Sequence, residues 1–359
     1  MKVGIVCPFS LERLTGTPIR AKTTINAVIG FGHDVLVMSR DSNPIAGAKI
    51  VTSGSVGLAS FTRVSLAALR VHQPDIVHGL TTASVLPMLL YKWFLNRRVK
   101  VIFEMHGWAW FEQERSSRFL VRLALSAIDY FGLWFANAVI AVSKTEKAFL
   151  SRRTFGNARI NVVWDPVDFN DPYLPAQTSS SVVVGYIGNS AWYQGLQHLI
   201  DAAKILASNE RVSFRLAGFD SSDEKMFPPL SRVSYIGRVE RADVVSFLQG
   251  CDMLVSPRLP EKVSNLQFPH KLSEYLVVGR PVIVSSASDQ PDVVRDGKCG
   301  IVAEPLSGES IAATIRTITD LSAVEREAWG RRAYEYAHEH IHAKVFAKKL
   351  GAVYASVLR

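Results

Sequence analysis

The sequence has 359 residues, of which 48% are hydrophobic and 20% charged. This length suffices for two globular domains, and this composition excludes an intrinsically disordered protein. Lysine and arginine number 41 against 32 aspartate and glutamate residues, which gives a net charge of +9. The positive charge favours anionic partners such as nucleotides, nucleic acid or an acidic membrane face, without choosing among them.

The three cysteines, Cys7, Cys251 and Cys299, lie far apart and match no zinc-binding or CxxC spacing. We therefore expect buried, reduced thiols and a cytoplasmic location. The opening MKVGIVCPFS has too short an apolar run for a signal peptide, and no apolar run reaches the roughly 20 residues of a membrane-spanning helix.

Short apolar runs alternate with helical segments in the first half of the chain. This alternation predicts right-handed βαβ units, a parallel sheet with helices on both faces. The expected strands are 2–7, 32–39, 48–52, 75–78, 100–104, 138–143 and 160–164, and the expected helices are 18–30, 57–72, 83–96 and 116–136.

Residues 165–181 interrupt the alternation with three prolines and the polar run QTSSS, and we interpret them as a linker between domains. The alternation then resumes. The expected strands are 181–188, 212–218, 233–237, 252–257 and 281–285, and the expected helices are 194–208, 241–249, 269–278, 308–321, 323–338 and 342–358. An apolar stripe on the last helix (Phe346, Leu350, Val353 and Val357) suits packing on the first half. The predicted domains are 1–168, with 342–359 returning to it, and 181–340.

The segment 268–285, FPHKLSEYLVVGRPVIVS, is the most informative stretch. Pro269 suits a first helical turn, Gly279 a left-handed cap, and the apolar residues follow helical spacing. Lys271 and Glu274 lie on another face, near the positive end of the helix dipole, where a bound anion would offset the lysine charge. The alternative is a solvated lysine and glutamate on a surface helix.

Unusual residues also follow other predicted strands. Parallel sheets bind ligands beyond the carboxyl ends of their strands, and two such domains would bind one in the cleft between them. The fingerprints GxGxxG, GxxxxGK[ST] and G-x-S-x-G are absent, as is any spacing typical of metal ligands. The candidates after strands or at helix starts are Gly16, Thr17, Arg20, His106, Gly107, Gly188 and Gly195.

Taken in order, these segments resemble retaining glycosyltransferases of family 4. The first half shows GTPIRA, GHDVLVMS, PDIVH, EMHG, AVIAVS and VVWDPVD, and the second GYIG, WYQGLQHLIDA, FRLAG, VSYIGRV, CDMLVSPR, FPHKLSEYLVVGRPVI and VVRDGKCGIVAEP. The resemblance implies a GT-B fold, in which two Rossmann-like doubly wound parallel-sheet domains face each other across a cleft. The C-terminal domain would hold a nucleotide-sugar donor and the N-terminal domain an acceptor.

The resemblance also assigns roles. Three residues are predicted to be catalytic: Glu274 would hydrogen-bond the donor ribose, His106 would lie near the transferred sugar, and Lys271 would face the diphosphate. The other expected donor-side residues are Gly16, Gly188, Asn189, Gln194, Gly195, Arg258, Phe268, Pro269, His270 and Leu272, and the expected acceptor-side residues are Thr17, Arg20, Glu104 and Trp108. No cofactor or metal is expected.

Three positions depart from the family pattern. Leu266 replaces the first glutamate of the E-x7-E motif, and Asn189 and Gln194 replace an arginine and a lysine that normally neutralise the diphosphate. Cations stabilise a leaving phosphate, so we expect compensation from Lys271, Arg258 or Lys262, with Lys271 best placed. Glu261 is a weak substitute for the missing carboxylate.

Aromatic residues beside cations, in 91–98 and again in 106–135, suggest a lipid-linked or saccharide acceptor and peripheral attachment to an anionic membrane face. The alternative places the aromatics in the core. Two other functions remain open: a nucleotide-sugar epimerase, and a degenerate protein that binds nucleotide without turnover. A nucleic-acid partner is not expected, because no recognised motif or long basic run is present.

Overall fold

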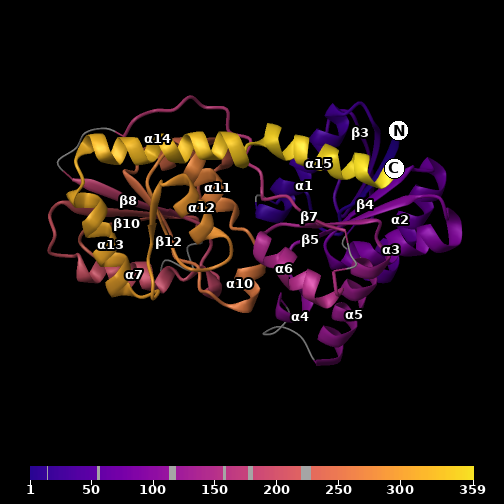
Figure 1. The fold of residues 1–359 in the computed structure, drawn as a ribbon, viewed down its shortest axis with the longest axis horizontal. Coiled ribbons are helices and arrows are strands. Elements are labelled where there is room, and N and C mark those ends of the chain that lie inside the picture. Colours follow the sequence, from indigo (N-terminus) through magenta and orange to yellow (C-terminus); the bar gives the residue numbers. More distant parts are fainter. Residues whose placement is uncertain (14, 55–56, 113–118, 157–158, 177–180, 220–227) are drawn as a thin grey trace. The chain divides into compact units, whose positions relative to one another are not determined.

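The computed structural model describes residues 1–13, 15–54, 57–112, 119–156, 159–176, 181–219 and 228–359. They form two compact units. The first comprises Met1–Pro166 and Ala343–Arg359, and the second comprises Val167–His342 (Figure 1). Part of the expected linker, residues 177–180, lies outside the described residues.

The first unit is built on a parallel seven-stranded sheet in the order β3-β2-β1-β4-β5-β6-β7. Its central strands are apolar on both faces because helices cover both (Figure 1). In β1, Val3 lies opposite Val35 on one side and Ile76 on the other. The strands are β1 (Lys2–Val6), β2 (Asp34–Ser39), β3 (Ala48–Thr52), β4 (Ile76–Leu80), β5 (Lys100–Met105), β6 (Ala138–Ala141) and β7 (Ile160–Val162).

The helices of the first unit differ from prediction in several places, and α4 (Ala109–Glu112) and α6 (Lys144–Arg153) were not predicted. The single helix expected over 83–96 is a 3-10 turn, a short α-helix and a π-helical turn, with Pro87 in the first turn of the α-helix. The helix expected from residue 116 is described from Phe119, and 116–118 lie outside the described residues. The segments are α1 (Gly16–Gly30), α2 (Leu58–His72), η1 (Thr82–Ser84), α3 (Val85–Leu90), η2 (Tyr91–Leu95), α4 (Ala109–Glu112), α5 (Phe119–Phe135), α6 (Lys144–Arg153) and α15 (Ala343–Leu358).

The C-terminal helix α15 completes the core of the first unit. It packs against α1, and its apolar stripe is buried in the same cluster as the β1 side chains of Val3 and Ile5. The stripe consists of Phe346, Leu350, Val353 and Val357.

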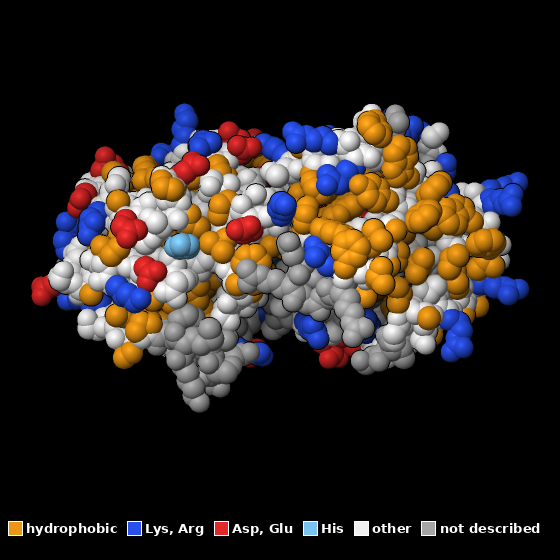
Figure 2. Space-filling model, turned by 90° about the horizontal axis from the view of Figure 1, so that it is seen from below, with side chains coloured by type: hydrophobic (Ala, Val, Ile, Leu, Met, Phe, Trp, Pro, Cys, Tyr) orange, Lys and Arg blue, Asp and Glu red, His pale blue; other side chains and the backbone are white. Residues whose placement is uncertain are grey.

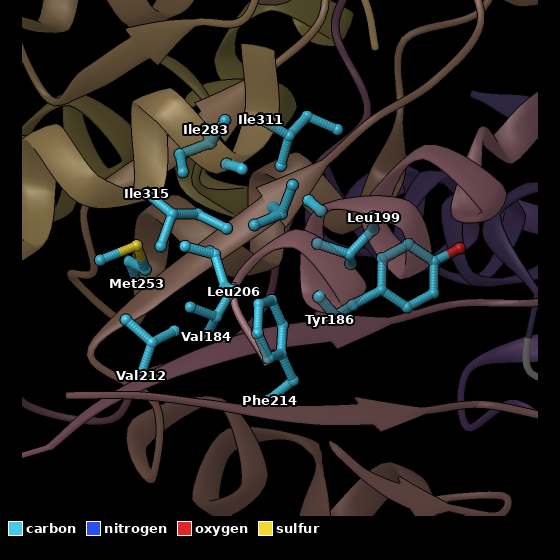
Figure 3. Packing of buried hydrophobic residues seen from close by; sticks show 14 of the residues in the cluster. Val184, Tyr186, Leu199, Leu206, Val212, Phe214, Met253, Ile283, Ile311 and Ile315 are labelled. Atoms are coloured by element: carbon cyan, nitrogen blue, oxygen red, sulfur yellow. The ribbon is translucent and has the colours of Figure 1, made fainter. Parts of the chain in front are cut away.

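The second unit contains a parallel six-stranded sheet in the order β10-β9-β8-β11-β12-β13. In its core, the β-strand residues Val184 and Phe214 meet Leu199 and Ile315 from helices (Figure 3). The strands are β8 (Val182–Ile187), β9 (Val212–Ala217), β10 (Val233–Ile236), β11 (Met253–Ser256), β12 (Val282–Val284) and β13 (Gly300–Val302).

Several short elements of the second unit were not predicted, among them α10, α12 and β13, because their apolar runs are too short to show a period. The segments are η3 (Trp192–Gln194), α7 (Leu196–Ile205), η4 (Arg241–Asp243), α9 (Val244–Gln249), α10 (Lys262–Leu266), α11 (His270–Val277), α12 (Gln290–Gly297), α13 (Gly308–Asp320) and α14 (Ala323–His340).

Helix α11 is enclosed on nearly every side. Gly279 follows it in the left-handed conformation (φ +71°), as predicted, and Pro269, expected in the first turn, is instead its N-cap. A side chain at Gly279 would meet the Tyr173 ring at 2.6 Å, so close packing also requires glycine there. Ser273 and Glu274 are buried together with the apolar face. The interpretation of α11 as a solvated surface helix is therefore wrong.

Candidate active site

A buried hydrogen-bond cluster lies at the carboxyl end of β5. His106 directs Nε2 to the Glu104 Oε1 atom at 2.7 Å, and its Nδ1 lies 3.3 Å from the Thr17 hydroxyl of α1. Only 12% of the His106 side chain is exposed, and Glu104 beneath it is fully buried. The sequence placed these three residues in one region, and the structure brings them into contact.

Arg20 contacts the cluster through Glu104. Its Nε donates to Glu104 Oε1 at 2.9 Å, and one terminal nitrogen donates both to Asp165 Oδ1 at 3.0 Å and to the Trp164 carbonyl at 2.9 Å. The guanidinium also lies over the Phe346 ring, 5.1 Å from its centre. Arg20 and Glu104 are both fully buried. They are therefore placed to support His106 rather than to touch an acceptor directly, which revises their expected role.

Glu104 is held as an anion. Burial alone would raise the pKa of its carboxyl, but the adjacent Arg20 guanidinium and the hydrogen bond from His106 lower that pKa well below its usual range. The ionised Glu104 accepts a hydrogen bond from the Nε2–H group of His106, and in this tautomer His106 Nδ1 is an acceptor. That acceptor faces a hydroxyl, the chemistry a sugar would also offer.

Sequence reasoning missed two residues behind this cluster. His78 of β4 is buried, with Nδ1 3.0 Å from the Tyr354 hydroxyl of α15 and Nε2 3.6 Å from Glu104 Oε2. Burial raises the pKa of Tyr354 well above its usual value, so the hydroxyl stays protonated and donates to His78. Nothing in the local sequence links β4 to a helix 276 residues later.

Glu146 was also missed. Its two carboxylate oxygens accept the backbone N–H groups of Gly107 and Val142, each at 2.8 Å, and burial raises its pKa well above the usual range. Glu146 thereby fixes the turn that follows His106, where Gly107 has φ +125°. The sequence contained a signal, because Ser143 caps α6 through the Glu146 N–H in the S-x-x-E spacing of a helix start.

Two other predicted residues of the first unit lie elsewhere. Gly16 was expected in a loop, but it begins α1 behind the N-cap Thr15. Trp108 is buried with its ring against Tyr130 and Phe149, at centre-to-centre distances of 4.9 and 5.5 Å. It contributes to an aromatic core and is not in the His106 cluster.

In the second unit, Lys271 reaches the end of β8. Its Nζ lies 4.2 Å above the centre of the Tyr186 ring and donates to the Tyr186 hydroxyl at 3.0 Å. That hydroxyl points away from the apolar cluster (Figure 3) and donates onward to the Asn189 carbonyl at 3.1 Å. A Cβ on Gly188 would lie 2.4 Å from Lys271 Nζ, so a larger residue there would displace the ammonium from this position.

The surroundings of Lys271, a partly buried residue, are positively charged. Burial and the nearby Arg258 guanidinium lower the pKa of Lys271 well below its usual value, and the carboxylate of Glu274 opposes them only partly. Among the described residues, no carboxylate forms an ion pair with Lys271. A bound anion would stabilise an ammonium that lies beside another cation and has no paired carboxylate.

The other donor-side candidates differ in how well they fit their expected role. Asn189 accepts through its carbonyl, and the buried Gln194 ends η3. Gly195 has φ +68° and packs against Pro257, whose carbonyl oxygen would be 1.7 Å from an added Cβ. Leu272 does not fit its expected role, because its side chain is buried and its N–H bonds to the Pro269 carbonyl at 2.9 Å.

Three positions around the start of α11 were expected to contact the donor through backbone. Phe268 and Pro269 are buried, and His270 begins α11 with Nε2 3.5 Å from Glu274 Oε1. The structure also shows the positions that bear on the missing first glutamate of the E-x7-E motif. Leu266 is buried in α10, and Glu261 is the exposed N-cap of that helix. Glu261 is therefore exposed, and among the described residues it pairs with no buried cation.

Glu274 is paired with a residue that the sequence analysis did not select. Its Oε1 accepts from a terminal nitrogen of Arg241, and the other terminal nitrogen of Arg241 donates to Asp168 Oδ1 at 3.1 Å. Although burial would raise the pKa of Glu274, the neighbouring His270 and Arg241 lower it. The carboxylate therefore stays ionised.

An apolar surface lies on the first unit over α5 and η2 (Figure 2). The buried residues of helix α5 are Ser126, Asp129, Gly132 and Leu133, and a Cβ on Gly132 would meet Phe103 at 2.7 Å. Most of its other large side chains are exposed. We call this the α5–η2 surface; it comprises Trp93, Phe94, Leu95, Phe119, Leu120, Val121, Leu123, Tyr130, Phe131, Trp134 and Phe135, each 37–77% exposed.

The alternative that placed these aromatics in the core is wrong for the α5–η2 surface. Trp93 and Phe135 meet edge to face at 5.2 Å, so η2 and α5 form one continuous patch. Arg97 and Arg98 are exposed just after η2. Within the described segments, no helix is long and apolar enough to cross a membrane, and no group of three or more potential ligands could hold a metal ion.

Both halves of the chain match glycosyltransferase families. Residues 15–171 match the family described as Glycosyltransferase Family 4, and residues 181–320 match Glycosyl transferases group 1. With its two Rossmann-like parallel sheets, the molecule is a GT-B glycosyltransferase. The chain belongs to family 4 of these enzymes, and its second half is of the group 1 type. A search of the curated proteins gives no match.

Solved structures support the fold. The chain is similar to sucrose-phosphate synthase from Thermosynechococcus elongatus (TM-score 0.81, 16% identity, 99% of each chain covered). It is similar to Anabaena Alr3699/HepE in complex with UDP-glucose (TM-score 0.76, 17% identity, 99% of this chain and 100% of the other). It is also similar to WaaG, a glycosyltransferase involved in lipopolysaccharide biosynthesis (TM-score 0.71, 16% identity, 98% and 99%).

Proposed function

We propose that the protein moves a sugar from a nucleotide diphosphate to an acceptor hydroxyl with retention at the anomeric carbon. The observation that carries this proposal is the position of Lys271 at the end of β8. Its ammonium lies beside Arg258 and Gly188, with no carboxylate partner among the described residues. A diphosphate supplies the missing negative charge.

Each predicted catalytic residue has a role in this proposal. Lys271, aided by Arg258, stabilises the negative charge that develops on the departing phosphate as its bond to the sugar breaks. Glu274 accepts hydrogen bonds from the donor ribose. His106, held through Nε2 by Glu104, accepts a hydroxyl of the transferred sugar through Nδ1. These fixed cations and dipoles take the place of a metal ion.

A donor screen tests the proposal. The protein is incubated with UDP-, GDP-, ADP- and CMP-sugars, and hydrolysis or transfer is followed by mass spectrometry. Lys271→Met removes the charge and should lower turnover about 100-fold or more, as expected for the loss of one group that stabilises developing charge. Lys204→Met is the matched control, because Lys204 is an exposed lysine of the same unit, paired with Asp201.

The same screen separates the alternatives. Conversion of the donor sugar without any acceptor would indicate an epimerase. Nucleotide binding without turnover would indicate a degenerate protein. Full activity of Lys271→Met would remove the assignment of the diphosphate site.

We further propose that the acceptor is lipid-linked or a growing saccharide of the cell surface, and that the protein docks peripherally on the cytoplasmic face of an anionic membrane. The outward-facing apolar residues of the α5–η2 surface support this, because an amphipathic helix of this kind inserts its apolar face among lipid headgroups. The neighbouring Arg97 and Arg98 add attraction to anionic lipids.

Vesicle sedimentation tests the docking. Vesicles of phosphatidylglycerol and phosphatidylcholine should bind the protein, and phosphatidylcholine alone should bind it less. Phe131→Ser with Trp134→Ser should abolish sedimentation. Val324→Ser is the control, because Val324 is an exposed apolar residue (77%) of the other unit. Unchanged binding of the double variant would contradict docking through this surface.

A further inference from the structure

Arg241, at the start of η4, is held by three neighbours in the second unit. Its terminal nitrogens donate to Glu274 Oε1 and to Asp168 Oδ1. Its guanidinium lies over the Phe169 ring, 4.3 Å from the ring centre. About a quarter of the side chain remains exposed. This combination of a forked ion pair and aromatic stacking is specific to arginine.

The contacts leave the two oxygens of Glu274 in different states. Oε1 accepts from Arg241 and faces His270 Nε2 at 3.5 Å. No described residue donates to Oε2. A carboxylate has about four acceptor sites, so Oε2 retains the capacity for a ligand hydroxyl, and the 9% exposure of the Glu274 side chain leaves it a narrow opening.

We propose that Arg241 is a positioning residue that makes the donor site selective for ribonucleotides. It keeps Glu274 oriented so that Oε2 accepts a ribose hydroxyl, and it acts through Glu274 rather than on the reacting atoms. This inference rests on the proposed function, since it assumes that Glu274 reads the ribose of a nucleotide donor.

Arg241 could instead compete with the ribose by occupying the carboxylate. The geometry favours orientation over competition. Asp168 and Phe169 hold the guanidinium independently of Glu274. The arginine therefore stays beside the carboxylate and restricts its orientation. It also occupies one oxygen only, and its removal would leave a nearly buried carboxylate without its principal cation, a costly state that favours rearrangement.

The test compares nucleotides that differ in one hydroxyl. Calorimetry first identifies which of UDP, GDP and ADP binds the wild-type protein. The dissociation constants of that nucleotide and of its 2′-deoxy and 3′-deoxy counterparts are then measured. One hydrogen bond to a charged group corresponds to about tenfold in affinity, so the wild type should prefer the ribonucleotide by about tenfold or more over at least one deoxy counterpart.

The variants isolate the role of Arg241. In Arg241→Met the preference should fall to within about twofold of unity, because deoxynucleotide binding changes little while the ribose bond is lost. Adding Glu274→Gln should cause no further loss of preference. Asp168→Asn, which keeps the Arg241–Glu274 pair, should retain most of it. Arg331→Met is the matched control: Arg331 also pairs with a glutamate, Glu327, and stacks on an aromatic ring, that of Tyr173.

The outcomes are distinct. A preference that Arg241→Met leaves unchanged, or equal losses for ribo- and deoxynucleotides, would overturn the inference while the proposed function stands. Tighter ribonucleotide binding by Arg241→Met would show competition and would also overturn it. If no nucleoside diphosphate binds the wild type, the proposed function fails, and the inference fails with it.

Discussion

The Tyr354 hydroxyl lies 3.0 Å from Nδ1 of His78, and both groups are buried. This contact joins α15 to β4 and sets the tautomer of His78, whose Nε2 then faces Glu104 Oε2. Glu104 in turn holds His106. The orientation of the candidate catalytic histidine thus depends on a tyrosine at the far end of the chain.

Tyr354→Phe should destabilise the protein by about 1–3 kcal/mol, because a buried imidazole nitrogen loses its donor. The free energy of unfolding in urea measures this. Tyr130→Phe is the control, since Tyr130 is 40% exposed and packs only through its ring. An equal, small effect of both substitutions would contradict a structural role of the hydroxyl.

Glu104 should make stability depend on acid pH. Its folded-state pKa lies below the unfolded value, so its contribution is present above about pH 4.3, the ordinary value for glutamate, and is lost as the pH falls through the lower folded-state pKa. Glu104→Gln should flatten the slope of unfolding free energy against pH by up to about 1.4 kcal/mol per pH unit in that range.

The same substitution should cost about 3–5 kcal/mol at pH 7, because it leaves the buried Arg20 guanidinium without its principal partner. Urea titrations at several pH values test both effects. Glu335→Gln, at an exposed glutamate, should change neither. A Glu104→Gln variant that keeps the wild-type acid slope would contradict the assignment.

Nucleotide affinity should weaken on the alkaline side at a lower pH than an ordinary lysine would allow. The pKa of Lys271 is lowered well below its usual value by burial and by Arg258, so its ammonium loses its proton earlier as the pH rises, and the attraction for diphosphate falls with it. Calorimetric titration of the bound nucleoside diphosphate across pH measures this. Lys271→Met should bind more weakly and lose that pH dependence, whereas Lys204→Met should keep it.

Gly195→Ala should be more destabilising than its backbone conformation alone explains. Gly195 and Gly54 both have φ +68°, but an added Cβ would lie 1.7 Å from the Pro257 carbonyl at Gly195 and would meet nothing within 4 Å at Gly54. Gly54→Ala should therefore cost about 1 kcal/mol of backbone strain. Gly195→Ala should cost about 2–4 kcal/mol, because overpacking adds to the strain. Equal losses in urea unfolding would show that the loop around Pro257 yields.

The sequence predicted those parts of the molecule whose signal is local. Buried parallel strands appear as short apolar runs, and the cap at Gly279 and the helix start at Pro269 are set by residue type. Thr17, Arg20 and His106 were selected by one rule, that loops after parallel strands meet at one edge of the sheet, and Glu104 was added by the resemblance to family 4.

The missed residues depend on contacts distant in sequence. Arg241 meets Glu274 across 33 residues, and His78 meets Tyr354 across 276, and no periodicity records such pairs. Helix α5 left two interpretations open for a different reason. Its apolar residues gave a strong helical pattern, but the pattern does not say which face turns inward, and here the buried residues are Ser126, Asp129, Gly132 and Leu133.

The return of α15 to the first unit has a consequence for the synthesis of the chain. The residues Phe346 to Val357 supply part of the core around Val3 and Ile5, and Tyr354 supplies the partner of His78. The first unit therefore remains incomplete while the whole second unit is being translated, and its last buried side chains arrive only when residues 343–359 leave the ribosome. The earliest residues made are among the last to reach their final packing.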